Sequence, residues 1–327
     1  MDLIAQLRVQ FEDFLSKNPL TKDPVSLYEP ADYILSIGGK RLRPVLTLLG
    51  TMLYGRHTQE AMKAAMAVEV FHNFSLVHDD VMDNADIRRG QPTVHKKYNI
   101  NTSILTGDVM LVKAYQYILD YEDPELVYAL MNAFNKMAFG VCEGQQLDMD
   151  FEKREDVNIQ EYLHMITLKT SVLIGAAIQM GAIVARADKQ DQFHIYEFGK
   201  NLGIAFQLQD DNLDVFGTQA QVGKRIGGDI LQNKKTYLYL KALELCSDEQ
   251  RAILENLYAE TAESINEDFK IETVTQIFKD VYVVEYSRQV IEAYRDLAFS
   301  HLDACKIASE FKKQLKDFVN EFIFREQ

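Results

Sequence analysis

Several residue types are scarce in this 327-residue chain, and their scarcity narrows the choice of fold. Tryptophan is absent, and none of the six prolines lies beyond Pro124. Because proline interrupts the interior of a helix, the long proline-free remainder favours long helices. Alternating Val, Ile and Thr segments between Asn-Gly or Asp-Gly turns are also lacking, so we expect no β-sheet.

Cysteine is rare as well, and its placement argues against two kinds of structural cross-link. Cys142, Cys246 and Cys305 are odd in number and widely spaced, which favours neither a disulfide framework nor a zinc site. We interpret them as buried free thiols of a protein in the reducing cytoplasm.

Positive charge is in short supply. The chain has 35 Lys and Arg residues against 49 Asp and Glu, which gives a formal net charge of −14. Binding to a phosphate backbone needs a basic surface, so we expect no nucleic-acid partner. A small diphosphate ligand is not excluded, because bound metal ions can reverse the local sign of charge.

Long hydrophobic runs are missing too. The N-terminal residues are acidic and amphipathic, unlike a signal peptide. The most apolar stretch, residues 172–185, is too short to cross a bilayer, and Gln179 interrupts it. We therefore expect a buried core helix there and no membrane span.

Apolar residues make up 47% of the chain and recur at intervals of three and four, as at Leu126, Leu130 and Phe134. We predict one all-α domain over residues 1–327, with a motif-bearing core at about 30–240 and C-terminal helices at 241–327. The expected helices are an N-terminal one, one from about Ala31 to Gly38, and those near 44–54, 59–83, 101–120, 125–148, 159–185, 189–216, 234–246, 248–263, 272–300 and 302–324.

Two clusters of the form Asp-Asp-x-x-Asp carry most of the chemical information. They consist of Asp79, Asp80 and Asp83, and of Asp210, Asp211 and Asp214. The first and last aspartates of each cluster share one helix face, where like charges weaken the helix. Such carboxylates suit a hard cation, and Mg²⁺ is usually held by a few carboxylates together with substrate phosphates. The pair predicts a metal–diphosphate site.

The alternative for each cluster is an ordinary solvated acidic face. Apolar residues precede both clusters, such as Phe74 and Val77 before the first and Phe206 and Leu208 before the second. A solvated helix would be polar all round, so these neighbours favour the metal site.

Basic and polar residues are placed where a diphosphate site would need them. They are Lys40, Arg43, Arg88, Arg89, Lys169, Lys224 and Lys234. Each could be an ordinary surface cation. Lys169 is the exception, because it lies in an apolar segment, where a lysine is costly unless it is paired. The alternative for Lys169 is that its long stem carries the charge out to solvent. His72 shares a helix face with Asp79, and Gln207 shares one with Asp210. The alternative for His72 is an ordinary core histidine, and the alternative for Gln207 is a buried amide that bonds to a neighbouring helix.

Together these motifs resemble the trans-isoprenyl diphosphate synthases, the head-to-tail prenyltransferases that include farnesyl and geranylgeranyl diphosphate synthases. The resemblance covers about residues 30–240 in the right order. Its motifs are Gly38-Gly39-Lys40-Arg41-Leu42-Arg43-Pro44, the first aspartate cluster with Arg88-Arg89-Gly90, Gly144-Gln145-Gln146-Leu147-Asp148, Lys169-Thr170, Gln207 and the second cluster.

The resemblance implies an antiparallel bundle of long helices around a deep cavity, usually in a homodimer. It implies Mg²⁺, with three ions and Mn²⁺ as a possible substitute, held by the six cluster aspartates. The family pattern makes Asp79, Asp83 and Asp210 the direct ligands.

The resemblance also implies two substrate sites. The allylic diphosphate would contact Arg88, Lys169, Thr170, Gln207, Lys224 and Lys234, and isopentenyl diphosphate would contact Lys40, Arg43, His72 and Arg89. Lys169, Thr170 and Gln207 would act catalytically, by stabilising the leaving diphosphate and the allylic cation. Arg325 would close the site in place of a more basic C-terminal tail.

Product length is expected to depend on Phe74, five residues before Asp79 on the same helix. In the family an aromatic residue here caps the pocket of short-chain enzymes. One bulky cap at Phe74 with a small neighbour, Ser75, favours a C20 product over C15, and Phe71 would form a second floor deeper on the helix. The alternative is that Phe74 is ordinary core packing.

Other functions share part of this pattern. A terpene cyclase or a head-to-head synthase would have the fold and the first cluster, but cyclases usually replace the second cluster. A non-catalytic subunit of a heteromeric synthase typically loses one cluster, and this chain keeps both.

Overall fold

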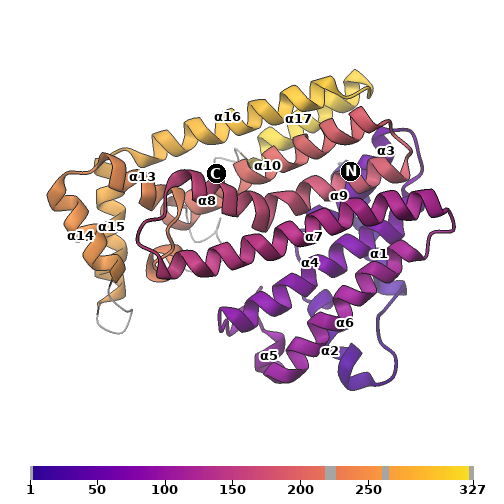
Figure 1. Ribbon diagram of the computed structural model, residues 1–327, viewed down its shortest axis with the longest axis horizontal. Helices are drawn as coiled ribbons and strands as arrows, with labels where there is room; N and C mark the ends of the chain where they lie inside the picture. The colour runs from indigo at the N-terminus through magenta and orange to yellow at the C-terminus, as the bar shows by residue number, and fades with distance from the viewer. Residues whose placement is uncertain (1–2, 218–225, 260–264, 324–327) are drawn as a thin grey trace. The chain divides into compact units, whose positions relative to one another are not determined.

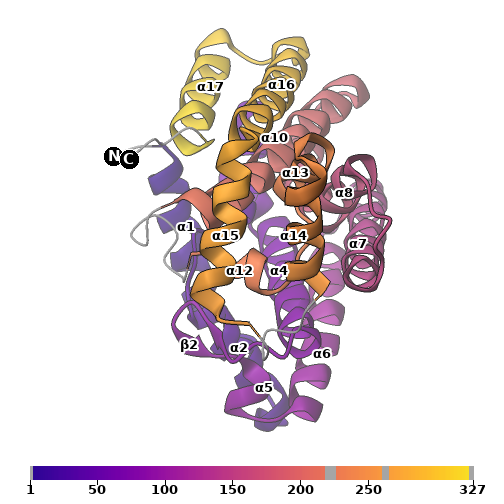
Figure 2. The same ribbon diagram turned by 90° about the vertical axis from the view of Figure 1, so that its left-hand side faces the viewer.

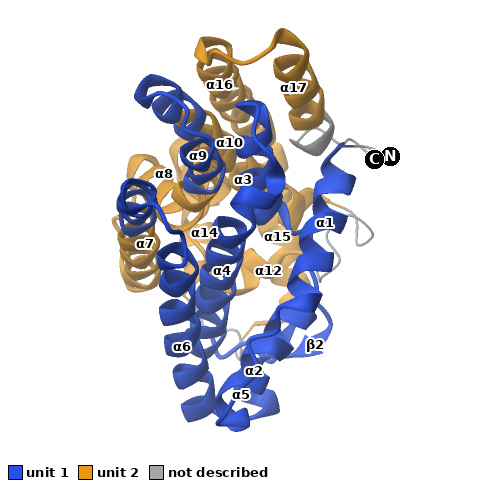
Figure 3. Ribbon diagram, turned by 90° about the vertical axis from the view of Figure 1, so that its right-hand side faces the viewer, with its two compact units in different colours: residues 1–136, 176–196 blue, residues 137–175, 197–327 orange. Residues whose placement is uncertain are grey.

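The computed structural model describes residues 3–217, 226–259 and 265–323, and its described elements are almost entirely helical, which confirms the all-α class (Figure 1). By their contacts the residues form two compact units, 1–136 with 176–196 and 137–175 with 197–327 (Figure 3). The chain passes from one unit to the other within helices α7, α9 and α10. The single domain expected from the sequence stays a prediction.

The first unit is built around a long pair of helices. Its elements are α1 (Leu3–Lys17), α2 (Val25–Ser36), α3 (Leu42–Leu53), η1 (Thr58–Ala61), α4 (Met62–Met82), β1 (Ile87–Arg88), β2 (Gln91–Pro92), α5 (Val94–Lys97), α6 (Ile100–Leu119) and parts of α7 (Pro124–Lys153), α9 (Val172–Val184) and α10 (Lys189–Phe216). Helix α4 packs along α6 and also contacts α3. Small and β-branched residues of α4, including Ala64, Ala67 and Val68, are fully buried and allow this close packing.

The second unit contains α8 (Ile159–Ile166), η2 (Thr167–Ser171), α12 (Gly228–Leu231), α13 (Tyr237–Leu245), α14 (Asp248–Ala259), α15 (Glu267–Asp280), α16 (Val283–Ala304) and α17 (Ser309–Ile323), with the remaining parts of α7, α9 and α10. Helix α15 packs against α12, α13 and α14 (Figure 2). It brings buried residues such as Val274 and Phe278 into the core of this unit.

Three local expectations are corrected by the structure. Helix α2 begins at Val25 and continues through Pro30, although proline disfavours a helix interior. The predicted helix at 272–300 is instead α15 and α16, which meet at Tyr282 in a left-handed conformation (φ 56°). An antiparallel hairpin of two two-residue strands, β1 and β2, occurs where no strand was expected.

The apolar stretch at 172–185 lies within a helical run that agrees with the helix predicted near 159–185. Ile159–Val184 is 26 residues long, enough in length and composition to cross a membrane. However, 72% of its most apolar window is buried within the protein. That burial agrees with the expected core helix.

Candidate active site

The first aspartate cluster lies at the C-terminal end of α4, and Asp83 is the C-cap of this helix. The Asp83 backbone N–H donates to the carbonyl of Asp79 at 2.8 Å, which continues the helical turn. Asp83 is exposed and Asp79 is half-buried. Because the C-terminal end of a helix carries partial negative charge, carboxylates here need a compensating cation.

Asp80 has its compensating cation within the protein. Only 1% of Asp80 is exposed, and Arg88 binds both of its carboxylate oxygens. The Arg88 Nε donates at 3.0 and 2.9 Å, and Nη2 donates to Oδ1 at 2.7 Å. This bidentate pair ties the segment after α4 back to the helix.

The glycine pair before α3 shapes a tight loop that holds Arg89. Gly39 has φ 129°, a conformation that favours glycine, and a Cβ there would lie 2.6 Å from the Arg89 guanidinium carbon and displace this side chain. The Arg89 guanidinium donates to the Gly38 carbonyl. Lys40 comes next, on the exposed side of this loop.

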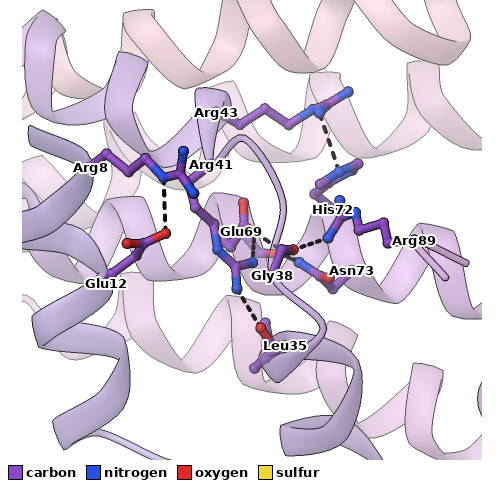
Figure 4. A network of polar contacts seen from close by, with 10 residues as sticks. All are labelled: Arg8, Glu12, Leu35, Gly38, Arg41, Arg43, Glu69, His72, Asn73 and Arg89. Atoms are coloured by element: carbon purple, nitrogen blue, oxygen red, sulfur yellow. Dashed lines mark hydrogen bonds and ion pairs between the residues drawn. The ribbon is translucent and has the colours of Figure 1, made fainter. Parts of the chain in front are cut away.

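A buried ion pair holds the same loop from its other end (Figure 4). Arg41, itself left-handed at φ 51°, donates to Glu69 of α4 at 2.5 Å and to the carbonyl of Leu35 in α2. Glu69 Oε1 also accepts from Asn73 Nδ2 at 3.1 Å. The network fixes the loop between α2, α3 and α4, and breaking such a buried pair is costly.

Arg43 and His72 contact one another beside this network (Figure 4). The Arg43 Nη1 and His72 Nε2 atoms are 3.2 Å apart. Since a guanidinium only donates, Nε2 must accept, and the imidazole is neutral with its proton on Nδ1. Burial, then the positive charge of Arg43, lowers the pKa of His72 well below 6.5. Burial likewise lowers the pKa of Arg43 to about 10, which leaves it charged at neutral pH.

Aromatic rings lie on the buried side of α4 just before the cluster. Phe74 packs against His78 and Phe71, with ring centroids 4.9 and 5.3 Å away. Phe71 is fully buried and contacts Phe134 at 5.3 Å. Ser75, the next residue, donates from its hydroxyl to the carbonyl of His72.

The second cluster lies at the C-terminal end of α10, where the helix dipole is again unfavourable for carboxylates. Asp210 is exposed, whereas Asp211 and Asp214 are 4% and 1% exposed. Asp214 Oδ2 accepts the backbone N–H of Asp229 at 2.9 Å. Asp214 therefore also anchors the start of α12.

Asp211 is held by neutral donors. The Tyr162 hydroxyl of α8 donates to Oδ2, and Gln207 Nε2 donates to Oδ1 at 3.2 Å. The hydroxyl of Thr170 contacts Gln207 Oε1 at 3.3 Å, which extends the chain of polar contacts. Burial, then the charge of Asp229, raises the pKa of Asp211 well above its ordinary value.

Lys169 and Thr170 lie in η2, a single π-helical turn between α8 and α9. Turns of this kind often mark functional sites. The Lys169 ammonium binds Asp148 of α7 at 2.5 Å, so the lysine is paired within the apolar segment. Gly144 allows this approach, because a Cβ there would collide with the backbone of Lys169.

A pocket in the second unit gathers these groups. Lys169, Thr170, Gln207 and Asp211 line it together with the segment after α12, and Met165 and Ile166 supply apolar wall. Lys234 and Asp229 also line it, with Nζ and Oδ1 4.0 Å apart.

The carboxylates of the two clusters are the type of ligand that a hard divalent cation prefers, but too few of them lie together to hold the cation without further ligands. Within the ranges that the structure describes, no three His, Cys, Asp or Glu side chains form a group that could hold a metal ion alone. The more exposed aspartates are Asp79, Asp83 and Asp210, whereas the other three are buried. A metal held by exposed carboxylates and diphosphate oxygens agrees with the way Mg²⁺ is usually bound.

The structure therefore brings the predicted residues together in two groups. The first unit gathers Lys40, Arg43, His72, Arg88, Arg89 and the first cluster, and the second gathers Lys169, Thr170, Gln207, Lys234 and the second cluster. Lys224 and Arg325 lie outside the described residues.

Four contributors were not singled out from the sequence. They are Glu69, Asp148, Tyr162 and Asp229. Asp148 stands within a motif already quoted and could have been found there, whereas Glu69, Tyr162 and Asp229 lie outside the quoted motifs.

His72 makes the fold sensitive to acid. Its pKa is lowered in the folded state, so the unfolded chain binds the proton first as pH falls below 6.5. We expect the free energy of unfolding to fall by up to about 1.4 kcal/mol per pH unit from this one group. His72→Gln keeps an acceptor for Arg43 but does not titrate, so urea unfolding between pH 7 and 5 should show a shallower slope. Equal slopes would contradict the assignment of a neutral imidazole with a lowered pKa.

Comparison with known proteins agrees with this geometry. Residues 24–276 match the family model described as polyprenyl synthetase. The chain is 36% identical to the geranylgeranyl diphosphate synthase of Sulfolobus acidocaldarius, covering 94% of this chain and 93% of the relative. It is 33% identical to the geranylfarnesyl diphosphate synthase of Natronomonas pharaonis, covering 98% and 96%.

Solved structures lead to the same family. A crystal structure of a geranylgeranyl pyrophosphate synthase has a TM-score of 0.95 at 48% identity, with 100% of both chains covered. The geranylgeranyl pyrophosphate synthase of Corynebacterium glutamicum, solved with isoprenyl diphosphate and magnesium, has a TM-score of 0.86 at 27% identity over 99% of each chain. Enzymes of this family are metal-dependent. From the match over most of its length and the two aspartate clusters, the chain belongs to the polyprenyl synthetase family of trans-prenyltransferases.

Proposed function

We propose that this enzyme condenses isopentenyl diphosphate with dimethylallyl, geranyl and farnesyl diphosphates, and that geranylgeranyl diphosphate is its main product. The observation that carries the proposal is the pairing of each aspartate cluster with its own set of cations. Arg88 and Arg89 accompany the first cluster, and Lys169 and Lys234 accompany the second. Such groups offset the negative charge of a diphosphate that leaves.

In this proposal the more exposed aspartates, Asp79, Asp83 and Asp210, would hold three Mg²⁺ ions, which Mn²⁺ can replace. Bound Mg²⁺ supplies Lewis-acid stabilisation of the departing diphosphate. The buried aspartates act on protein groups instead, since Asp80 orients Arg88 and Asp211 orients Gln207.

The reaction then depends on the remaining side chains. The allylic C–O bond breaks and its electron pair leaves with the diphosphate, which Arg88, Lys169, Lys224 and Lys234 would bind. Oxygen dipoles of Thr170 and Gln207 would stabilise the allylic cation. The double bond of isopentenyl diphosphate, held by Lys40, Arg43, His72 and Arg89, attacks that cation, and a proton is lost to the released diphosphate.

Removal of one exposed ligand tests the catalytic role of the clusters. Asp79→Ala and Asp210→Ala should each reduce kcat by about 100-fold or more with unchanged helical circular dichroism, because a group that stabilises transition-state charge is lost. Asp317→Ala, an exposed carboxylate of α17, is the matched control and should leave kcat unchanged. Near-normal turnover by either cluster variant would overturn the assignment. Absence of turnover by the purified wild type would favour a non-catalytic subunit.

Product length is proposed to depend on Phe74. The row of Phe74 and Phe71 supports this, because rings at this depth would stop a growing apolar chain. The named relatives make both geranylgeranyl and longer geranylfarnesyl diphosphate, and farnesyl diphosphate is the shorter alternative for this chain.

Phe74→Ala should lengthen the products, because it removes a ring that would stop the growing chain. Ser75→Phe should shorten them, because it adds a ring next to Phe74. Chromatography of the dephosphorylated products measures both. Phe278→Ala removes a buried ring from α15 and should lower Tm without altering product length, which controls for a loss of about 3–5 kcal/mol of packing energy. If Phe74→Ala behaves like this control, Phe74 is ordinary core.

We propose that the enzyme is a cytoplasmic homodimer, and the surface of α6 supports the dimer. Leu105, Val112 and Leu119 succeed one another at seven-residue intervals, and all three are more than half exposed. Residues at this spacing lie on one helix face, which a second copy would cover. Cys142, Cys246 and Cys305 form no disulfide with one another, which is compatible with the cytoplasm, although only Cys305 is buried as expected and Cys142 is exposed.

Val112→Glu should convert the dimer to a monomer, because it places a charge in the middle of the apolar face. Light scattering coupled to size exclusion measures the mass directly. Ile253→Glu introduces the same charge at an exposed apolar residue of α14 and should leave the mass unchanged. A monomeric wild type, or a dimer that persists in Val112→Glu, would contradict this interface.

A further inference from the structure

Lys270 of α15 is a buried cation in the C-terminal part of the chain, beyond the motifs that identify the family. Only 1% of it is exposed, and it ranks among the largest fully buried side chains. Lysine is almost never buried this completely unless it is paired. Its position therefore needs an explanation beyond packing.

The ammonium of Lys270 lies among polar and aromatic groups. It donates to the side-chain oxygen of Asn233, and it is 5.5 Å from the ring centroid of Tyr258. Burial, then nearby Tyr239, Asp229 and Asp214, raises the pKa of Tyr258 well above its ordinary value. Tyr258, which neighbours Lys270, thus lies within electrostatic reach of Asp229 and Asp214, and nearby negative charge favours the charged form of a lysine.

Asn233 is the residue through which Lys270 can act on the pocket. It has a left-handed conformation, φ 56°, and its backbone N–H donates to Ile230 at 3.2 Å. The next residue, Lys234, donates its backbone N–H to the Asp229 carbonyl at 2.9 Å. Fixing the Asn233 side chain therefore fixes the direction in which Lys234 leaves the turn.

The same short segment is anchored at its other end by the second aspartate cluster. The Gly227 N–H donates to the Asp214 carbonyl at 2.7 Å, and the Asp229 N–H donates to the Asp214 carboxylate at 2.9 Å. The segment 227–234 is thus bonded to Asp214 near its start and, through the Asn233 side chain, to Lys270 near its end. Asp229, Asn233 and Lys234 line the pocket, whereas Lys270 is not among its described lining residues.

We propose that Lys270 is a positioning residue for the allylic diphosphate site, acting through Asn233 on Lys234 and Asp229. The proposal rests on the assignment of this pocket to the allylic substrate. Lys270 touches no substrate. It sets the geometry of the turn that presents the binding groups, and a misplaced turn weakens diphosphate binding.

A charge deletion of similar length tests this role. In the full-length enzyme, Lys270→Met should raise KM for the allylic diphosphate about tenfold, equivalent to ~1.4 kcal/mol. KM for isopentenyl diphosphate should change by less than about twofold, since its proposed residues lie elsewhere in the chain. Calorimetric titration with a non-reactive allylic thiodiphosphate and Mg²⁺ should show the same tenfold loss. Wild-type turnover and KM for isopentenyl diphosphate report on the proposed function separately.

Two further variants keep the test decisive if Lys270→Met is poorly folded. Asn233→Gly retains the left-handed backbone and removes the acceptor, so it should also raise the allylic KM. In the double variant the effects should not add, because both changes break one link. Val274→Ala, a buried residue of α15, is the control and should lower Tm with both KM values unchanged. An unchanged allylic KM in Asn233→Gly, or additive effects in the double variant, would overturn the proposal.

Discussion

Carboxylates at the C-terminal ends of two helices are the constraint on which the described site depends. Asp83 caps α4, and Asp214 lies within the last turn of α10. At both places the helix dipole and the neighbouring aspartates add negative charge, so each isolated cluster is unfavourable. The arrangement of arginines, lysines and neutral donors around the clusters reflects the need to offset that charge while some carboxylates stay exposed.

The two units meet this constraint in different ways. In the first, Arg88 neutralises the buried Asp80 directly with a bidentate pair. In the second, Asp211 receives hydrogen bonds from Tyr162 and Gln207, neither of which carries charge. These hydrogen bonds lower the pKa of Asp211 but offset only part of the increase that burial and the charge of Asp229 produce.

Local patterns were enough to predict the helical class and the residues with distinctive chemistry. The clusters, Lys169 and Gln207 could be recognised because their spacing or apolar setting is unusual within one helix. The break at Tyr282 could not, since neither glycine nor proline marks that left-handed residue. The ion pair of Arg41 with Glu69 joins residues 28 positions apart, and no sequence period links such partners.

The π-helical turn η2 determines which way the side chains after it face about the helix axis. A π turn contains about one residue more than an α turn, which rotates the later residues of the helix by roughly 100° relative to an uninterrupted helix. Tyr162 before the turn and Thr170 within it thereby both join the polar chain that reaches Asp211, although they stand eight positions apart. The rotational phase of the helix is therefore part of the site. Loss of one residue between Thr167 and Ser171 would rotate polar groups out of the chain even if every remaining side chain were kept.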